Sequence, residues 1–240
     1  MILFGESFIP DTNTFFVLCV VPSDCKKVLD EFPEAKSGQY EIELWTSGKI
    51  LTVNCDMKTD GGGWTIFHRR MDGSVDFYRN FTEYEKGFGN VDGELWLGLQ
   101  YIKELAEQGS TEIRLDMARN DSTTGHETCQ DFKLTEGNNY KLNIGSCTGL
   151  TGKRFAFNNQ MSFSTNDRDL DMSSDRNCAV EGHGAWWYNS CTRVNLNGLY
   201  VAPGTICEFP GALDDFCGHW HYGFDKLYAL RTSSMMIRRK

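Results

Sequence analysis

Large, mostly apolar side chains alternate with polar ones along much of this 240-residue chain. A period of two places such side chains on one face of a β-strand. The alternation is clearest in segments 40–44, 64–68, 113–117 and 140–144. Twenty-four glycines supply the turns that many strands require. The pattern predicts a β-rich protein.

Two segments have helical spacing instead. The first is a short helix expected between Asp24 and Gly38, with Ser23 as its cap, Gly38 past its end and apolar positions at Val28, Leu29 and Phe32. The second is expected at about 94–108, before Gly109, with apolar positions at Leu95, Leu99, Ile102 and Leu105.

One hairpin can be placed by its symmetry. Residues 136–139 have the composition of a turn between two alternating strands. Cys129 and Cys147 lie at equal distances in sequence from residue 138, so they should face each other across the hairpin. We therefore predict a disulfide between them.

Periodicity fades after Ser146, and loops rich in Asn, Asp, Ser and Gly follow until two last expected strands, at 226–230 and 235–239. A long irregular region is commonly held together by disulfides or a bound ion and often contains a binding site. There is no internal repeat or sustained heptad. If the protein forms homo-oligomers, these residues do not show how.

Charge and hydropathy exclude several classes of protein. The formal net charge is −9, which is unlike that of a nucleic-acid binder. No apolar run reaches the roughly 18 to 20 residues of a membrane-spanning helix. Residues 1–23 contain the apolar run TFFVLCVV after Glu6 and Asp11, without a preceding Lys or Arg, and are read as a leader or an extension outside the core.

The cysteines favour an oxidising, secreted setting. Eight of the nine cysteines remain once Cys19 is set aside with the leader, and this even number fits four disulfides. The chain has no CxxC pair, the motif typical of a zinc site. Two glycosylation sequons begin at Asn80 and Asn120 and agree with a secreted glycoprotein.

No catalytic motif is present: the chain lacks a GxSxG elbow, an HExxH helix, a P-loop and a GxGxxG fingerprint. The GGGW stretch at 61–64 is interpreted as a turn with close backbone approach. His219 and His221 could share a metal, but we expect them to be exposed residues on one strand face.

The stretch NDRDLDMSSDRNC, at 166–178, contains aspartates at alternate positions. Such side chains can converge on Ca²⁺ while backbone carbonyls complete its shell. Met172 and Cys178 stand where an EF-hand counted from Asp167 needs Gly and Glu, so this is not an EF-hand. From spacing alone, a metal site and a solvated acidic turn are equally good interpretations.

Several long motifs resemble the fibrinogen C-terminal domain, which occurs in ficolins, tachylectins, angiopoietins, tenascins and fibrinogen. They are CDMKTDGGGWTIFHRRMDGSVDFYRNF (55–81), EKGFG and DGELWLGL (85–99), MSFSTNDRDLD (161–171), CAVEGHGAWWYNSCTRVNLNGLY (178–200) and YALRTSSMMIRR (228–239). The resemblance implies one α+β domain over 24–239, with a small N-terminal subdomain, a central antiparallel sheet with helices, and a loop-rich C-terminal subdomain for calcium and ligand.

The resemblance also implies particular pairs and ligands. It implies disulfides Cys25–Cys55 and Cys178–Cys191, which leaves Cys207 to pair with Cys217. Asp169 and Asp171 match the calcium carboxylates, and Asp167 is expected outside the first coordination shell. The carbonyl donors are expected at Ser173 and Asp175 or their next neighbours.

In acetyl-binding lectins of this family the ligand pocket lies beside the calcium loop. The matching peptide is Ser190–Cys191, followed by Thr192 where a histidine is common. The positions of the usual apolar wall hold Gly182, Asp214 and Asp215, and acidic residues there would favour an ammonium or hydroxyl donor over an acetyl methyl group. In AWWY, at 185–188, the tryptophans are interpreted as core residues in preference to a sugar-stacking platform.

These observations lead to one main functional hypothesis. It is a secreted, non-enzymatic, lectin-like domain that binds Ca²⁺ and recognises glycans or microbial surface groups in innate immunity. The alternative is an extracellular matrix or signalling module that binds a protein receptor, as in tenascin- and angiopoietin-like members.

Overall fold

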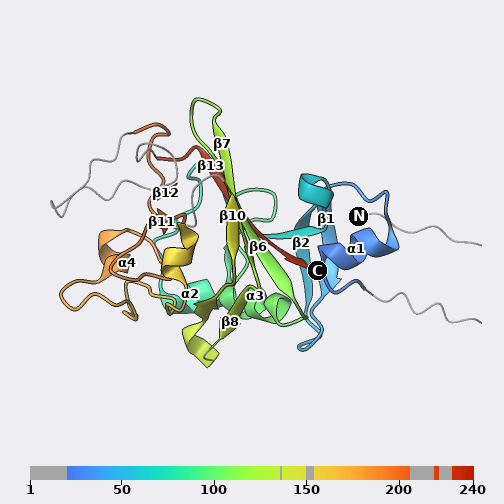
Figure 1. Ribbon diagram of the computed structural model, residues 1–240, viewed down its shortest axis with the longest axis horizontal. Helices are drawn as coiled ribbons and strands as arrows, with labels where there is room; N and C mark the ends of the chain where they lie inside the picture. Colours follow the sequence, from blue (N-terminus) through green and yellow to red (C-terminus); the bar gives the residue numbers. More distant parts are fainter. Residues whose placement is uncertain (1–20, 136, 150–153, 206–218, 222–228) are drawn as a thin grey trace, which may run out of the picture.

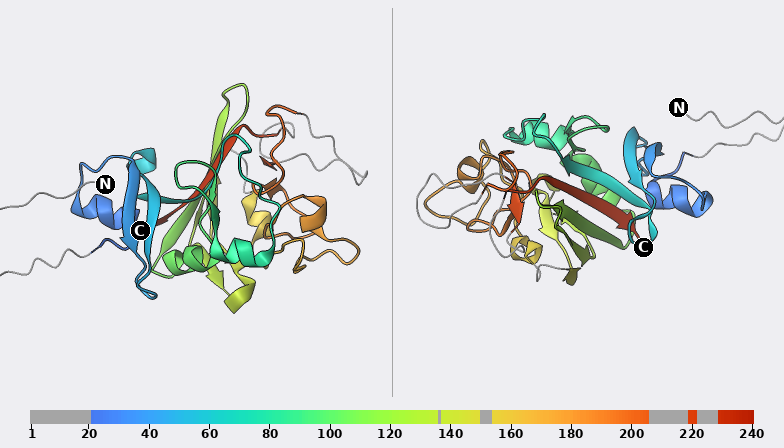
Figure 2. Two further views of the ribbon diagram at one scale, coloured as in Figure 1. Left: turned by 180° about the vertical axis from the view of Figure 1, so that it is seen from behind. Right: turned by 90° about the horizontal axis from the view of Figure 1, so that it is seen from above.

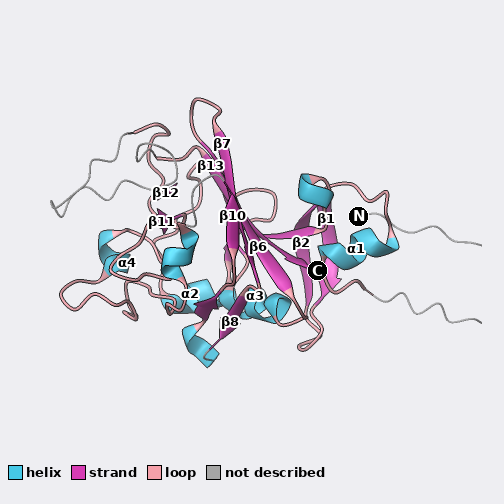
Figure 3. Cartoon of the chain, viewed as in Figure 1, coloured by secondary structure: helices cyan, strands magenta, loops and turns pink. Residues whose placement is uncertain are grey.

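The computed structural model describes residues 21–135, 137–149, 154–205, 219–221 and 229–240. Within these ranges a large antiparallel sheet forms the centre of the molecule, in the strand order β1-β2-β3-β13-β6-β7-β10, with β5 on β3 and β4 on β5 (Figure 1). Short helices and long loops lie around it (Figure 3). The expected α+β class is therefore confirmed.

The strands of the central sheet come from all parts of the chain. They are β1 (Gly38–Glu43), β2 (Ile50–Asp56), β3 (Trp64–Arg70), β4 (Phe88–Gly89), β5 (Leu95–Trp96), β6 (Thr111–Ala118), β7 (Thr124–Gln130), β10 (Cys147–Gly149) and β13 (Thr232–Arg239). Two small sheets pair β8 (Lys133–Thr135) with β9 (Lys141–Asn143) and β11 (Val194–Asn195) with β12 (Trp220–His221). The last strand thus inserts between β3 and β6, which makes the sheet a long-range structure.

The four α-helices among the described residues are short: α1 (Cys25–Glu31), α2 (Phe81–Lys86), α3 (Leu99–Ala106) and α4 (Cys178–Glu181). The cap of α1 is Asp24 and not Ser23, because the Asp24 carboxylate accepts the Lys27 N–H at 2.7 Å. This helix ends well before the expected Gly38, since Pro33 disfavours a helical conformation at the preceding residue.

The second expected helix also begins later than its spacing suggested. Leu95 belongs to β5, and α3 starts only after Gly98. Gly98 has φ +117°, and a Cβ there would lie 2.9 Å from the Lys86 carbonyl carbon. The close approach of two backbones therefore separates the strand from the helix.

The hairpin prediction is confirmed. Strands β8 and β9 pair in the register Lys133↔Asn143, symmetric about residue 138. Cys129 and Cys147 face each other farther out, in β7 and β10, and form a disulfide with Cα atoms 4.0 Å apart. The alternation in the two strands thus predicted both their register and the disulfide correctly.

Two other predictions had different outcomes. The GGGW turn is confirmed, since Gly62 has φ +75° and a Cβ there would lie 2.4 Å from the Met57 carbonyl oxygen. The prediction that His219 and His221 are exposed is wrong, because both are buried. His219 stacks on Tyr200 with ring centroids 4.9 Å apart, and His221 contacts buried Glu127 at 3.1 Å.

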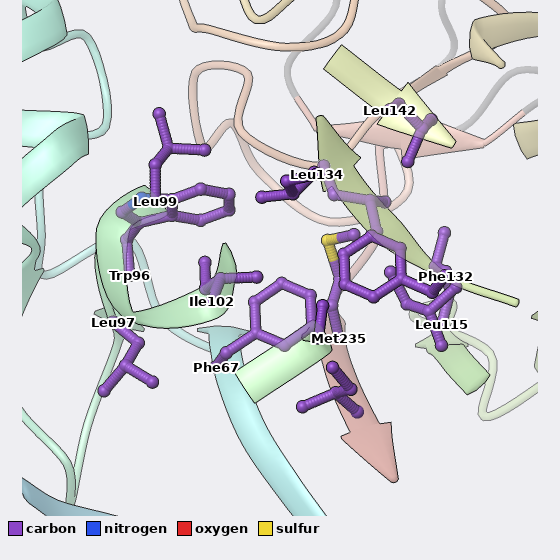
Figure 4. Packing of buried hydrophobic residues seen from close by; sticks show 14 of the residues in the cluster. Phe67, Trp96, Leu97, Leu99, Ile102, Leu115, Phe132, Leu134, Leu142 and Met235 are labelled. Carbon is purple, nitrogen blue, oxygen red and sulfur yellow. The ribbon is translucent and has the colours of Figure 1, made fainter. Parts of the chain in front are cut away.

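The main core includes buried side chains of the sheet and of the helices α2 and α3. Figure 4 shows the part of it around Phe67, Trp96 and Ile102. Trp96 is at its centre, with ring centroids 6.0 Å from Phe67, 5.3 Å from Tyr84, 5.6 Å from Phe163 and 6.3 Å from Trp187. One aromatic cluster therefore joins the sheet, α2 and the C-terminal loops.

The two ends of the molecule differ in character. The unit formed by α1, β1 and β2 lies at one end, and the loops around α4, β11 and β12 lie at the other (Figure 2, left, and Figure 1). This arrangement matches the expected order of a small N-terminal subdomain, a central sheet and a loop-rich C-terminal part. Lys226 and its two successors lie outside the described residues, and Ala229 and Leu230 are not in a strand.

Candidate functional site

The loop before Cys178 is organised by its own aspartates. Both oxygens of Asp171 accept backbone N–H bonds, from Ser173 at 2.7 Å and from Cys178 at 2.8 Å. Asp169 Oδ1 accepts the Asp171 N–H at 3.2 Å, and the Ser173 hydroxyl donates to Asp175 Oδ1 at 3.0 Å. The four residues expected to hold a metal therefore lie together in one hydrogen-bonded turn.

The charge of Asp171 is disfavoured by its surroundings. Burial raises the pKa of this carboxyl, and the neighbouring Asp169 carboxylate raises it further, against the lowering effect of the two N–H donors. Burial also raises the pKa of the nearby Tyr188 phenol, to which the Asp171 charge contributes. A cation held by both carboxylates would offset this repulsion.

The donor atoms fit calcium. The loop offers carboxylate, hydroxyl and carbonyl oxygens, the hard ligands that Ca²⁺ prefers. Cys178 is bonded to Cys191 and supplies no thiolate. We therefore regard Asp169 and Asp171 as the residues able to hold Ca²⁺ through their carboxylates.

The acidic loop is fastened to the segment expected to bind ligand. The Met172 N–H donates to the Asn189 carbonyl at 3.0 Å, and the Cys178 N–H bond to Asp171 joins the loop to the Cys178–Cys191 disulfide. The Ser190–Cys191 peptide is cis, and Ser190 is exposed. Only one or two hydrogen bonds therefore connect the acidic loop to the segment of the Ser190–Cys191 peptide, so a shift of the loop would also move this peptide.

Thr192 has internal partners. Its hydroxyl donates to the Val194 carbonyl at 2.7 Å and accepts from Asn158 Nδ2 at 2.9 Å. The same Asn158 amide donates to the Trp187 carbonyl at 2.8 Å. At the position where the family resemblance leads one to expect a histidine, this chain thus has a short side chain that is hydrogen-bonded within the protein.

Gly182, the first of the positions expected to form the pocket wall, is buried. Its carbonyl accepts from Asn195 Nδ2 at 3.1 Å, and a Cβ there would lie 2.8 Å from the Tyr188 hydroxyl. Any side chain at this position would therefore displace Tyr188. Asp214 and Asp215 lie outside the described residues, as do Cys207 and Cys217.

The tryptophans of AWWY are core residues, as expected from the sequence. Trp186 and Trp187 are 0% exposed, and Trp187 Nε1 donates to the Tyr140 carbonyl at 2.8 Å. Met172 is 65% exposed and Val180 is 43% exposed, so apolar side chains do lie on the surface of the loop and of α4. Sequence reasoning did not identify these two, because no spacing marks a single apolar residue in a loop.

Asp167 and the two sequons have clear structural positions. Asp167 Oδ1 accepts from the Phe81 N–H at 2.9 Å and from the Thr165 hydroxyl at 2.6 Å, so its carboxylate supports the start of α2. Asn80 caps the same helix, with Oδ1 accepting the Glu83 N–H at 2.9 Å. Asn80 and Asn120 are both exposed.

A buried ion pair attaches the C-terminal loops to the sheet. Arg70 lies 3.5 Å from Glu94 and donates to the carbonyls of Gly198, at 2.7 Å, and Leu196, at 3.3 Å. Arg70 and Glu94 are 1% and 0% exposed. Sequence reasoning missed this pair, because the two residues are distant in sequence and have no motif.

Three disulfides are seen among the described residues: Cys25–Cys55, Cys129–Cys147 and Cys178–Cys191. Glu127 lies close to the sulfurs of the second one, but these are bonded to each other and are not free to act as thiolate ligands. No helix in the described ranges is both long and apolar enough to cross a membrane.

Known proteins share both the sequence and this geometry. Human tenascin-R is 43% identical over 183 residues, which cover 75% of this chain and 13% of tenascin-R. Fibrinogen-like protein A of Apostichopus parvimensis is 42% identical over 187 residues, which cover 75% of this chain and 65% of that protein. Human ficolin-3 is 41% identical over 222 residues, which cover 90% of this chain and 70% of ficolin-3. The chain thus spans less than two thirds of the length of tenascin-R and of fibrinogen-like protein A.

Solved structures agree with the sequence comparisons. The fibrinogen-like globe domain of human ANGPTL6 superimposes with a TM-score of 0.82 at 32% identity, over 91% of this chain and 96% of that one. Lamprey fibrin D-dimer, in complex with the peptide Gly-His-Arg-Pro-amide, has a TM-score of 0.82 at 28% identity, over 97% and 78%. The family model for the fibrinogen beta and gamma chains, C-terminal globular domain, matches residues 21–240. The chain therefore belongs to this fibrinogen C-terminal domain family.

Proposed function

We propose that this chain is a secreted, calcium-binding recognition domain of lectin type. It binds glycans or microbial surface groups in innate defence and catalyses no reaction. One observation supports this most: the loop of Asp169 and Asp171 is hydrogen-bonded to the segment that presents Ser190 and Cys191. An ion on that loop would fix the position of the exposed peptide.

The role of calcium in this proposal is positional. When bound, Ca²⁺ would neutralise the two carboxylates and supply a rigid centre for the loop. Asp171 would then hold the N–H groups of Ser173 and Cys178 in place, and Asn189 would hold Met172. The exposed Ser190–Cys191 peptide would offer backbone donors and acceptors to a ligand in a fixed geometry, which reduces the entropic cost of binding.

The ligand pocket differs from that of an acetyl-binding lectin. Because the Thr192 hydroxyl is hydrogen-bonded to Asn158 and Val194, it has less hydrogen-bonding capacity left for a ligand than a histidine side chain would have. Ser190, two residues before Thr192, is exposed and carries a hydroxyl group that a ligand can reach. We therefore expect hydroxyl-rich ligands to bind better than the acetyl group alone.

A glycan array tests the proposed function. A multimerised form of the protein would be used, because multivalency raises the avidity of weak single sites. We expect hits that disappear on adding EDTA and that are lost in Asp169→Ala plus Asp171→Ala, while the surface control Glu107→Ala retains them. An array without any calcium-sensitive hit would count against the lectin proposal.

Binding to an extracellular protein receptor is the second candidate. It is favoured by the internal use of the Thr192 hydroxyl and by the lamprey fibrin relative, whose structure contains a bound peptide. Capture of one extracellular protein by the wild type, with unchanged affinity in the double aspartate variant and no glycan hits, would favour this candidate over the first.

A further inference from the structure

The central sheet has a groove on the face opposite the main core, lined by polar and charged side chains together with apolar surface. Its volume is about 590 Å³, and its lining comes chiefly from β3, β6, β7 and β13. None of its lining residues belongs to the segment 166–192, which contains the calcium loop and the Ser190–Cys191 peptide. The groove is therefore separate from the site described above.

Four groove residues form a row across four neighbouring strands. Ser234 is paired with Arg69 on one side and with Asp116 on the other, and Asp116 is paired with His126. Directly opposed residues in a sheet point to the same face, and strands lie about 4.8 Å apart, so the row is about 14 Å long. Met235, the next residue in β13, is fully buried on the core face. The row thus faces away from the core.

A second, shorter row continues the groove. Thr232 is paired with Ala118, and Ala118 is paired with Thr124. This row adds two hydroxyl groups next to the charged row, and the small side chain between them leaves space above the sheet. Two parallel rows of hydrogen-bonding groups therefore line one continuous hollow.

The charged side chains of the groove are already held in position. Arg69 Nε donates to the Gly93 carbonyl at 2.7 Å, and its Nη2 donates to the Val91 carbonyl. Arg114 Nε donates to Asp116 Oδ1 at 2.9 Å. Because these side chains are ordered before a ligand arrives, binding costs less conformational entropy than at a flexible surface.

The charges in the groove are balanced. Arg69 and Arg114 stand against Asp92 and Asp116, while the fifth charged lining residue, Arg70, is paired with buried Glu94. An anionic ligand would meet two carboxylates, and a cationic ligand would meet two guanidinium groups. Neutral hydroxyl groups can donate to the carboxylates and accept from the guanidinium groups and hydroxyls without meeting a repulsive charge.

We propose that this groove binds a neutral oligosaccharide, as a second glycan site that needs no metal. The inference rests on the proposed lectin function, since it assigns a second site to the same activity. Arg69, Ser234, Asp116 and His126 contact the sugar hydroxyls, and Thr232 and Thr124 extend the contact. A metal-free site would let the domain keep part of its glycan binding when calcium is removed.

The test uses an array of neutral, sialylated and sulfated oligosaccharides in the presence of EDTA. The multimerised wild-type chain is expected to keep hits among the neutral glycans. The double substitution Ser234→Ala plus His126→Ala, which removes two hydrogen-bonding groups, should weaken these hits at least tenfold. Asp169→Ala plus Asp171→Ala should leave them unchanged, as should Thr148→Ala on the exposed part of β10.

Each outcome separates this inference from the calcium site. Absence of EDTA-resistant binding by the wild type overturns the groove site, even if calcium-dependent hits are found. EDTA-resistant hits restricted to acidic glycans, or retained in the groove variant, also overturn it. EDTA-resistant neutral hits without any calcium-dependent ones would support the groove and contradict the proposed calcium-dependent function. The single variant His126→Ala, at a partly exposed position, gives the same test if the double variant does not fold.

Discussion

Substitution of Glu94 by glutamine is expected to destabilise the domain strongly. The Glu94 carboxylate is fully buried and accepts backbone N–H bonds from four residues of the loop 71–75, at 2.8 to 3.2 Å. Burial alone would raise the pKa of Glu94, but these N–H donors and the Arg70 guanidinium outweigh it and hold the pKa below its usual value. The charged carboxylate is therefore what the site is built around.

The expected loss follows from the contacts of this one side chain. Removing one partner of a buried ion pair costs about 3–5 kcal/mol, because the other charge is left uncompensated. In Glu94→Gln the uncompensated charge is Arg70, which also holds the carbonyls of Leu196 and Gly198. The amide group additionally turns a donor toward backbone N–H groups that need an acceptor. We therefore expect the free energy of unfolding to fall by about 3–5 kcal/mol.

Urea unfolding followed by tryptophan fluorescence, with the disulfides intact, measures this loss. The matched control is Glu107→Gln, which removes one partner of an exposed helical pair with Lys103 and should cost less than about 0.5 kcal/mol. An effect of Glu94→Gln no larger than that of the control would refute the reasoning that Arg70 and Glu94 join the C-terminal loops to the sheet.

Three further predictions concern pH, a disulfide and a helix start. Burial, and then the Arg70 charge, lower the pKa of His68 to about 3, so between about pH 6.5 and 3 only the unfolded chain takes up this proton. Acidification through that range should therefore reduce the free energy of unfolding by about 1.4 kcal/mol per pH unit through His68 alone. His68→Gln should lower the slope measured in urea titrations by this amount, and the exposed control His183→Gln should not. Replacing Cys129 and Cys147 by alanine opens a loop with a sequence separation of 18 and should cost about 3 kcal/mol in the same assay, and an unchanged unfolding midpoint would contradict this. Asp167→Ala should lower the free energy of unfolding by about 1 kcal/mol through loss of its bond to the start of α2, and calcium binding measured by calorimetry should be unaffected; loss of calcium binding would place Asp167 in the first shell.

Local patterns predicted those parts of the fold that depend on neighbouring residues. The hairpin of β8 and β9 and the Cys129–Cys147 disulfide follow from alternation about residue 138. The close packing at Gly62 follows from the conformations that glycine allows. The insertion of β13 between β3 and β6 could not be predicted in this way, because no local property specifies a partner that lies more than a hundred residues away.

The candidate site shows the same division. The spacing of Asp169 and Asp171 was visible in the sequence, and resemblance to a family indicated their role. The internal bonds of Thr192 to Asn158, and the support that Asp167 gives to α2, depend on contacts between separate segments. The burial of His219 was predicted wrongly because alternation defines two faces of a strand but does not say which elements cover them.

The groove on the sheet illustrates why register matters. Arg69, Asp116, His126 and Ser234 are each ordinary polar residues in their own strands. Only the pairing of β3, β13, β6 and β7 places them in one row. A sequence without a known strand order gives no reason to group them.

A calcium titration followed by thermal unfolding tests the central claim most directly. If Asp169 and Asp171 hold Ca²⁺ in the folded chain only, the wild type should gain about 2.7 kcal/mol at a free calcium concentration 100 times the dissociation constant. For a domain of this size that gain raises Tm by roughly 5–11 °C. The variant Asp169→Ala plus Asp171→Ala should show no rise, while Glu107→Ala should behave as the wild type. A wild-type Tm that does not change with calcium, or an equal rise in the double variant, would contradict the account.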